Sequence, residues 1–281
     1  MKKFYALLLI MVFLCNISFC NAAIISDSDN SSYYAKVNEY DLLLNLSNRS
    51  RQQLFHEGYS TEEINDIYNL PISYKNYLEQ YTDYPDYALK NMGYSQEQIT
   101  LFRNFTGSEE QLRSLAATLS FSVLIDYVTW SASQNRTNAR VTFDFEWSGV
   151  PFIKTTDIVA LTWNDWTIMG KNCTVTYLFG DGTKTQIGSG TYVENSGPNS
   201  FGGGFKFSMV KEDNTYWAKS GFGVFTLYHN YEMHDLSLYG EYGHSTIVTS
   251  PTFSIPGYGS IGFSYGTEMA ASDHDDRTVK I

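Results

Sequence analysis

Cysteine is scarce in this sequence. Only three of the 281 residues are cysteine, and two of them, Cys15 and Cys20, lie in the apolar stretch at the N-terminus. If that stretch is removed on export, only Cys173 remains, which excludes an internal disulfide and leaves the hydrophobic core to hold the fold. Because Cys173 shares one face of a predicted strand with Val175 and Tyr177, we expect a buried core residue rather than a reactive thiol.

Positive charge is also scarce. The chain has 19 Lys and Arg residues against 30 Asp and Glu residues, a formal net charge of −11 at pH 7, and its basic residues form no cluster. Such a chain repels the phosphates of nucleic acids and anionic lipids. We therefore expect no nucleic-acid partner, and contact with a membrane only through the N-terminal segment.

Long apolar runs are missing everywhere except at the N-terminus. Residues 1–3 carry two lysines, residues 4–20 are mostly apolar, and Ala22 and Ala23 follow. A positive start, a hydrophobic segment and small residues are the successive parts of a signal peptide. We expect residues 1–22 to be a signal peptide and the protein to be secreted or held at the cell surface. An uncleaved anchor is the alternative, although the apolar stretch is short for a membrane span.

Sequence motifs of catalysis are absent as well. The chain has no Gly-x-Ser-x-Gly, no His-Glu-x-x-His and no phosphate-binding loop. Residues 202–204 are three glycines, but neither a lysine nor a predicted helix follows them, so we predict a flexible loop or a bulge there. The sequence therefore indicates no cofactor and favours a non-enzymatic role.

Glycine and tryptophan are nearly missing from the first 117 residues. Only Gly58, Gly93 and Gly107 occur there, and all five tryptophans lie beyond that point. A glycine-poor part followed by a part rich in glycine and aromatics predicts an α+β protein. We expect a helical region over residues 27–117 and a β region over residues 118–281.

The helical region contains an internal repeat, residues 54–64 and 89–99. In each copy a glycine suits the left-handed position that ends a helix. A serine two residues later suits the N-cap of the next helix, and Glu or Gln three residues further on completes a capping box. These residues are Gly58, Ser60 and Glu63 in the first copy and Gly93, Ser95 and Gln98 in the second. We predict a helix, a Gly-Tyr turn and a helix, twice, and a similar cap at Ser108 with Gln111.

The second copy resembles a loop of a known family. Met92, Gly93 and Tyr94 are similar to the Met-Gly-aromatic loop of ubiquitin-associated domains, which implies a ubiquitin-binding surface. The first copy, Gly58 and Tyr59, lacks the methionine, and an exported protein does not meet ubiquitin. We therefore interpret both copies as helix-capping chemistry.

The β region shows alternating patterns. Residues 141–147 place Val, Phe, Phe and Trp on one face and Thr, Asp and Glu on the other, which is typical of a half-buried strand that forms a hairpin with residues 121–130. Further strands are predicted at residues 157–163, 172–179, 183–194, 205–211, 216–228, 236–242, 247–255 and 258–265. Many short strands without intervening helices predict an antiparallel β-sandwich or open barrel.

Two acidic residues offer a hydrolytic alternative. Asp144 and Glu146 lie two apart on the outward face of one predicted strand, which separates their carboxyl groups by about 7 Å, in the range of an inverting glycosidase. An exposed strand face normally carries such acids. We favour that interpretation and keep the hydrolase as an alternative.

Metal sites are weak candidates. The densest grouping of ligand-type side chains is His229, Glu232, His234, Asp235 and His244, whose spacing matches no structural zinc pattern. Asp273 and Asp275 could supply oxygens to calcium. Surface turns near a chain end show the same composition, so no metal is expected.

Aromatic residues near predicted strand ends suggest the binding site. Trp166, Tyr216 and Trp217 are expected to form an exposed platform, because aromatic faces stack on sugars and on peptide side chains. We therefore expect a secreted, non-enzymatic protein that binds a surface component or a glycan through its β region. The alternatives are a glycan-cleaving hydrolase that uses Asp144 and Glu146, and a membrane-damaging, toxin-like protein whose amphipathic strands insert.

The N-terminal pattern gives a first prediction. Exported protein should begin after Ala22 or Ala23, because the small residues there follow the hydrophobic segment. N-terminal sequencing of the protein recovered outside the cell checks this. A chain that still begins at Met1 would contradict the assignment.

Overall fold

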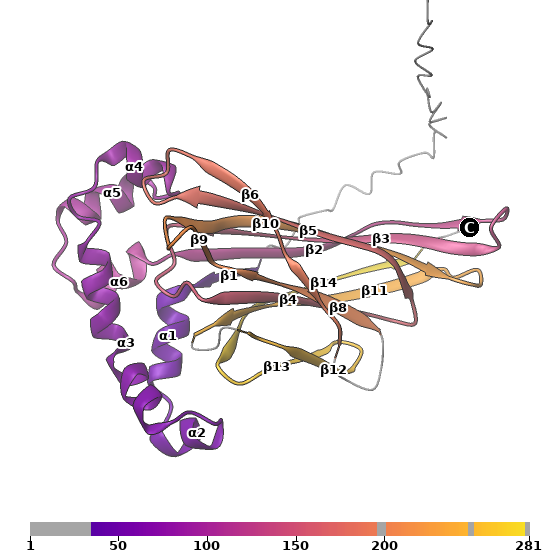
Figure 1. The fold of residues 1–281 in the computed structure, drawn as a ribbon, viewed down its shortest axis with the longest axis horizontal. Helices are drawn as coiled ribbons and strands as arrows, with labels where there is room; N and C mark the ends of the chain where they lie inside the picture. Colours follow the sequence, from indigo (N-terminus) through magenta and orange to yellow (C-terminus); the bar gives the residue numbers. More distant parts are fainter. Residues whose placement is uncertain (1–34, 196–200, 247–249, 279–281) are drawn as a thin grey trace, which may run out of the picture. The chain divides into compact units, whose positions relative to one another are not determined.

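After the short strand β1 (Ala35–Asn38), helices occupy the first part of the chain and strands the remainder (Figure 1). The computed structural model describes residues 35–195, 201–246 and 250–278. The helices are α1 (Glu39–Ser47), α2 (Arg51–His56), α3 (Thr61–Glu79), α4 (Asp86–Asn91), α5 (Gln96–Arg103) and α6 (Glu109–Leu115). The strands are β1 (Ala35–Asn38), β2 (Thr118–Ser131), β3 (Arg136–Ser148), β4 (Thr156–Trp163), β5 (Thr167–Phe179), β6 (Thr185–Ser189), β7 (Thr191–Val193), β8 (Gly202–Ser208), β9 (Val210–Lys211), β10 (Tyr216–His229), β11 (Asp235–Ser245), β12 (Phe253–Gly257), β13 (Ser260–Phe263) and β14 (Thr267–Thr278).

The helix caps follow the local sequence. Ser60 accepts a hydrogen bond from the backbone N–H of Glu63, whose carboxylate accepts one from the Ser60 N–H at 2.7 Å. Ser95 and Gln98 form the same reciprocal pair at the start of α5. Both capping boxes were predicted, because they depend only on residues three apart. A further box, formed by Ser50 and its third neighbour at the start of α2, was not predicted.

The cap at Ser108 differs in one respect. Ser108 caps α6 as predicted, accepting from the Gln111 N–H at 3.3 Å. The Gln111 side chain, however, turns away and accepts from the N–H groups of Thr106 and Gly107, at 2.8 and 3.1 Å. Gly107 has a positive φ of 73°, which bends the preceding turn so that its donors face Gln111.

The strands form two larger antiparallel sheets and one small hairpin. The seven-stranded sheet has the order β1-β2-β3-β10-β5-β6, with β9 also paired to β10. The five-stranded sheet has the order β14-β11-β4-β8-β7, and β12 pairs with β13. A chain of N-terminal helices followed by antiparallel strands was expected from the glycine distribution, and the fold confirms it at this level.

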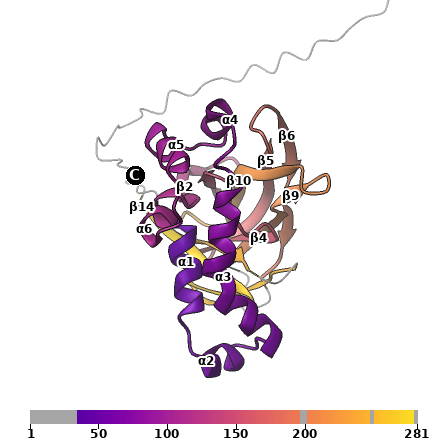
Figure 2. The same ribbon diagram turned by 90° about the vertical axis from the view of Figure 1, so that its left-hand side faces the viewer.

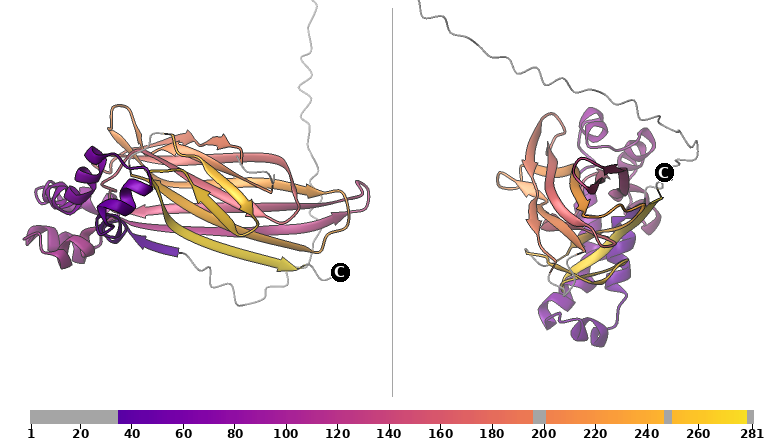
Figure 3. Two further views of the ribbon diagram at one scale, coloured as in Figure 1. Left: turned by 90° about the horizontal axis from the view of Figure 1, so that it is seen from below. Right: turned by 90° about the vertical axis from the view of Figure 1, so that its right-hand side faces the viewer.

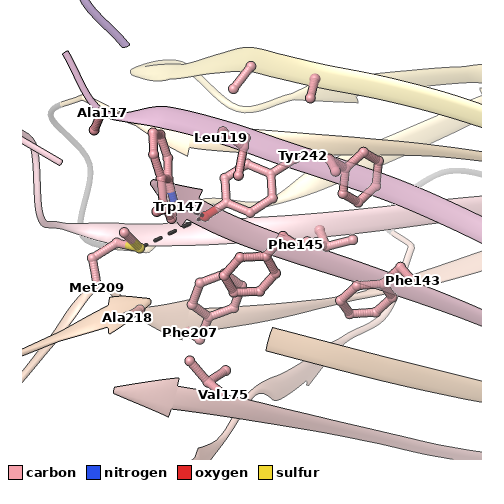
Figure 4. Packing of buried hydrophobic residues seen from close by; sticks show 14 of the residues in the cluster. Ala117, Leu119, Phe143, Phe145, Trp147, Val175, Phe207, Met209, Ala218 and Tyr242 are labelled. Carbon is pink, nitrogen blue, oxygen red and sulfur yellow. Dashed lines mark hydrogen bonds between the residues drawn. The ribbon is translucent and has the colours of Figure 1, made fainter. Parts of the chain in front are cut away.

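The inner faces of the two larger sheets share one hydrophobic core (Figure 4). Phe145 of the seven-stranded sheet stacks on Phe207 of the five-stranded sheet, with ring centroids 4.8 Å apart and planes 7° apart. Gly221 lies opposite Phe145 on the neighbouring strand, and a Cβ atom there would lie 2.3 Å from the Phe145 ring. The glycine therefore makes room for an aromatic ring that reaches across to the other sheet.

The hairpin β12–β13 covers the outer face of β4. Ile158 and Ala160 of β4 pack against Phe253 and Ile255 of β12, and all four are buried. This cover explains why almost every residue of β4 is buried, although alternate residues of a strand point to opposite faces. The glycines at residues 202–204 lie within strand β8, where Gly204 approaches the Phe253 ring. The prediction of a flexible loop there was wrong, because these glycines serve close packing.

One edge of the two sheets is joined by continuous backbone. Strand β6 belongs to the seven-stranded sheet and β7 to the five-stranded sheet, and Gly190 alone separates them. The Gly190 N–H donates to the carbonyl of Cys173 at 3.1 Å, and a Cβ atom on Gly190 would lie 2.7 Å from the Cys173 sulfur. Cys173 is buried, as predicted, and burial raises the pKa of its thiol to about 11.

The helices gather at one end of the strands (Figure 2). Both Gly-Tyr turns reach the β region there. Tyr94 accepts a hydrogen bond from the Val150 N–H at 3.2 Å, and the ring of Tyr59 meets that of Tyr265 at 4.7 Å. Within the described ranges, none of the helices has the length and hydrophobicity that crossing a membrane requires.

The caps give a second prediction. Replacing Ser60 or Ser95 by Ala should each lower the free energy of unfolding by about 1 kcal/mol, because each change removes a side-chain acceptor from the first turn of a helix. Chemical denaturation measures the change. Ser114→Ala is the control, because Ser114 is exposed and caps no helix start. Equal midpoints for all three variants would refute the role of the caps.

Candidate functional site

A surface site lies where the residues that flank helix α2 meet β13, β14 and the turn between them. A cavity of about 310 Å³ opens there, and we call it the seam cavity. It is lined by Arg49, Glu57, Tyr59, Phe263, Ser264, Tyr265, Gly266, Thr267 and Glu268. A second cavity of about 220 Å³ is lined by Glu63, Asp66, Ile67, Leu70, Ile153 and Thr246. The hydroxyl of Tyr265 donates to the Glu63 carboxylate at 2.7 Å, so the two cavities are neighbours.

Arg49 is the central charged group of the seam cavity. Its guanidinium donates to Glu57 at 2.8 Å and to both carboxylate oxygens of Glu268, at 2.5 and 3.2 Å. The two carboxylates come from different parts of the chain, one from the end of α2 and one from β14. The single positive charge of Arg49 lies between the two negative charges of Glu57 and Glu268, so the net charge of the cavity is negative. The hydrogen bonds among the three side chains hold them in place.

Two tyrosine rings form the aromatic wall of the cavity. Tyr59 and Tyr265 meet edge to face, at an interplanar angle of 61°. Tyr59 is buried, whereas Tyr265 is 37% exposed and can contact a bound molecule. Burial and the hydrogen bond to Glu63 raise the pKa of Tyr265 to about 12, so the phenol keeps its proton at neutral pH.

The Gly-Tyr turn explains how this wall forms. Gly58 has a φ of +105°, which ends α2 and directs the next residue into the β region. A Cβ atom at Gly58 would lie 3.3 Å from the Tyr265 ring, so the glycine also gives this ring room. The sequence indicated the turn through its capping pattern. It gave no sign that Tyr59 and Tyr265 would meet, because the two lie far apart in the chain.

A buried charged cluster lies beneath the helix end of the molecule. It consists of Glu39 at the start of α1, Asp157 in β4 and His244 in β11, and none of the three has exposed surface. The His244 Nδ1 atom lies 3.0 and 2.9 Å from the two Asp157 oxygens. The Nε2 atom lies 3.5 Å from a Glu39 oxygen. One imidazole thus joins a carboxylate of the helical region to a carboxylate of the five-stranded sheet.

The Glu39 carboxylate is held by donors from two further elements. It accepts the backbone N–H groups of Phe152 and Ile153, at 2.8 and 3.0 Å, and the hydroxyl of Tyr74 at 3.1 Å. A buried carboxylate is tolerated where several donors surround it. Glu39 therefore ties α1, α3 and the segment before β4 together.

Asp157 has an equally complete set of donors. The Tyr242 hydroxyl donates to it at 2.6 Å and the Ser245 N–H at 3.1 Å, in addition to His244. Tyr242 in turn accepts from the Trp147 indole at 3.2 Å (Figure 4). Burial alone would lower the pKa of His244, but Asp157 and Glu39 outweigh this and raise it to about 10. The histidine is therefore a buried cation at neutral pH, and because water does not reach it, the cluster serves to hold the fold together.

The expected aromatic platform is not exposed. Trp166 and Trp217 are only 2% and 3% exposed and belong to the hydrophobic core. Trp217 lies near the start of β10, but Leu178 and Val210 on neighbouring strands pair with it on both sides, so this strand end is covered. Trp166 lies in the turn after β4, and its carbonyl accepts from the Trp163 indole at 2.9 Å. The prediction of exposure was wrong for both.

Tyr216 is half-buried, and its ring packs on Phe179 with centroids 5.2 Å apart. Because Trp166 and Trp217 are buried, the predicted three-residue platform does not form. A position near the end of a strand did not predict exposure of the side chain, because it does not show which neighbouring strands extend past that end.

The two candidate catalytic acids lie on the outer face of the seven-stranded sheet. Asp144 is half-buried and accepts from the Ser122 hydroxyl at 2.9 Å, while Glu146 is paired with Lys219 at 2.9 Å. Burial raises the pKa of Asp144, and the charges of Asp273 and Glu146 add to the shift. The side chain of Glu146 is 64% exposed. Neither acid lines the two cavities described above.

The candidate metal ligands either lie apart from one another or accept hydrogen bonds from the backbone. His229 and His234 flank the turn between β10 and β11, and the His229 Nδ1 accepts the Tyr231 N–H at 3.2 Å. Asp273 and Asp275 accept backbone N–H groups of β2. Among the residues that the structure describes, no group of three or more His, Cys, Asp or Glu side chains could hold a metal ion.

Sequence reasoning missed the charged cluster. Of its three members, only His244 was singled out from the sequence, as one of several possible metal ligands. Glu39 and Asp157 stand in unremarkable surroundings, and no local pattern links them to a histidine on another strand. The one available signal is an acidic residue at a strand position that should be buried, as at Asp157.

Comparisons with known proteins add little. No protein-family model matches the sequence, and no curated protein matches it. Among solved structures, the collagen-binding subdomain of the Enterococcus faecalis surface protein ACE aligns with a TM-score of 0.28 and 11% identity, over 57% of this chain and 96% of that one.

A collagen-binding domain from a Staphylococcus aureus adhesin aligns with a TM-score of 0.30 and 6% identity, over 57% of this chain and 97% of that one. The membrane-inserted form of the Clostridium perfringens NetB toxin aligns with a TM-score of 0.24 and 8% identity, over 58% of this chain and 90% of that one. These TM-scores are too low to indicate a shared fold, so the likenesses carry no argument about this chain.

The charged cluster gives a third prediction. Replacing His244 by Gln should lower the free energy of unfolding by about 3–5 kcal/mol at pH 6, because two buried carboxylates lose their cation. The folded-state pKa of about 10 lies above the ordinary value of 6.5. The stabilisation from the charged imidazole is therefore full below about pH 6.5 and is lost as the pH rises through about 10.

Urea unfolding of the original protein and of His244→Gln, at several pH values, measures the difference. It should be largest near pH 6 and shrink steadily as the pH approaches about 10. His274→Gln is the control, because His274 is exposed on β14. A difference between the two proteins that stays constant with pH would mean that the imidazole is uncharged in the fold.

Proposed function

We propose that this is a secreted or cell-surface protein that binds an extracellular ligand, a glycan or another surface component, without turning it over. The seam cavity is the binding site in this proposal. The observation that carries it is the combination of an open cavity, a partly exposed tyrosine and a guanidinium held between two carboxylates. Export is inferred from the signal-peptide pattern of residues 1–22.

The chemistry of the cavity suits a polyhydroxylated ligand. Glu57 and Glu268 can accept pairs of hydroxyl hydrogen bonds, and Tyr265 offers a ring face beside them. A volume of about 310 Å³ lies at the lower end of small-ligand sites, enough for one sugar unit. In this proposal the seam cavity takes the place of the predicted platform of Trp166 and Trp217. Binding still takes place through the β region, because Glu268 belongs to β14 and Tyr265 to the turn before it.

The remaining strands act as the scaffold of this site. We propose that the two larger sheets form a β-sandwich over residues 118–281 and that residues 27–117 form a helical region docked on one end of it. Their shared core and the buried cluster support this arrangement. The site then lies at the junction of two rigid parts, where ligand cavities commonly occur.

A glycan-cleaving activity of Asp144 and Glu146 is the second candidate. The direction of the Asp144 pKa shift favours it, since a carboxyl group that acts as a general acid needs a pKa above its ordinary value. The exposure of Glu146 and its pairing with Lys219 weigh against it, because a catalytic base needs a cleft that shields it. The toxin-like alternative has no contact in the described residues that favours it.

The binding proposal gives a fourth prediction. Mature protein applied to a glycan array should retain at least one glycan class, and titration calorimetry should then measure its affinity. Tyr265→Ala or Glu57→Gln should weaken that affinity by about tenfold or more, equivalent to about 1.4 kcal/mol. Tyr258→Ala is the matched control, because Tyr258 is a 50% exposed tyrosine between β12 and β13 that does not line the cavity.

A double variant separates binding from hydrolysis. Asp144→Asn with Glu146→Gln should leave the affinity unchanged, and no product should appear when the glycan is incubated with the original protein. Product release that this double variant abolishes would replace the binding proposal by the hydrolase. An affinity that falls equally in Tyr258→Ala and Tyr265→Ala would exclude the seam cavity as the site.

A further inference from the structure

One long strand edge in the seven-stranded sheet is only partly paired. Strand β2 pairs with β3 over nearly its whole length. On its other side, its pairing within the described residues is with β1 and runs from Thr118 to Phe121. Within the described ranges, no strand continues this pairing beyond Phe121. A row of unpaired N–H and C=O groups at a sheet edge is a template on which another strand can add.

Side chains of β14 occupy this edge instead of a strand. Asp273 accepts the Val123 N–H at 2.9 Å, and Asp275 accepts the Ile125 N–H at 2.7 Å. Arg277 donates to the backbone carbonyl of Asp126 at 2.7 Å. Two carboxylates of β14 thus accept from two backbone N–H groups of β2, and one guanidinium of β14 donates to a backbone carbonyl of β2. The three side chains come from every second residue of β14. We call Asp273, Asp275 and Arg277 the edge guard.

The guard residues stand where apolar residues are expected. In the pairing of β14 with β11 they lie opposite Gly240, Leu238 and Leu236. Both leucines are fully buried, so the side chains on this face of the five-stranded sheet point to the core. Strand β14 runs alongside β2 at this border of the two sheets (Figure 3). Inward-pointing charges at a sheet edge are a known means of preventing edge-to-edge association.

We propose that the edge guard prevents strand β2 from pairing with the same edge of a second copy of this chain. Two identical edges can pair antiparallel about a two-fold axis, so that every unpaired group on one copy meets its complement on the other. Residues 122–126 are the part of the edge that the guard covers, and Leu124 at their centre lies near that axis. Its side chain is 43% exposed on the outer face, so a neighbouring copy would also cover apolar surface.

The test removes the guard and measures association. Asp273→Ala with Asp275→Ala should lower the dimer dissociation constant by at least about tenfold in sedimentation velocity over a concentration series. In dilute, monomeric samples, the backbone amides of Val123 and Ile125 should exchange with solvent faster. His274→Ala with Asp276→Ala is the matched control, because both residues are exposed on the same strand and neither side chain is the acceptor of the two β2 hydrogen bonds that the double variant removes.

A crosslink locates the contact. Leu124→Cys in the guardless background should form a disulfide-linked dimer on mild oxidation, because the two thiols lie close at the axis, whereas Leu124→Cys in the control background should not. Cys173 does not compete, since it is buried. Should the double alanine variant not fold, Asp275→Ala alone removes one of the two carboxylates and takes its place in every measurement.

Three outcomes overturn the proposal. The first is faster amide exchange without any increase in association, which would make the guard a stabilising contact only. The second is unchanged exchange at residues 123 and 125. The third is a dimer that forms without the crosslink at residue 124, which would place the new contact on another surface.

Discussion

One buried histidine between two carboxylates links the helices to the strands. His244 has no exposed surface and lies between Asp157 of β4 and Glu39 of α1. A charge buried in this way is tolerated only while its partners stay in place, so the three side chains fix one relative position of the helical end and the five-stranded sheet. Glu39 also binds two backbone N–H groups of the segment before β4, which extends the constraint to that connection.

The seam cavity depends on this constraint. Its lining comes from residues just before and just after α2 on one side, and from β13, β14 and the turn between them on the other. A site built from two parts of a chain keeps its geometry only if the parts cannot slide. Arg49, which contacts Glu57 and Glu268, is a second and weaker link across the same border, because both of its carboxylates are partly exposed.

Local features of the fold could be predicted from the sequence, and the site could not. The caps at Ser60 and Ser95 rest on residues three apart, so the sequence contains all the information. The outward position of Asp144 and Glu146 follows equally from strand alternation. The seam cavity combines Tyr59 with Tyr265, a contact that no local pattern encodes. The exposure of Trp166 was misjudged because burial depends on which other strands reach it.

The two larger sheets are connected differently along their two borders, by backbone at Gly190 and by side chains between β14 and β2. On that side the backbone passes directly from β6 to β7, so the sheets cannot part there without breaking the ladder of one or the other. On the opposite side, the bonds that the described residues form across the border between β14 and β2 come from the side chains of Asp273, Asp275 and Arg277. We therefore expect the two sheets to separate more easily along β2 and β14 than beside Gly190, and the inner face exposed there is the one beside Val123 and Ile125.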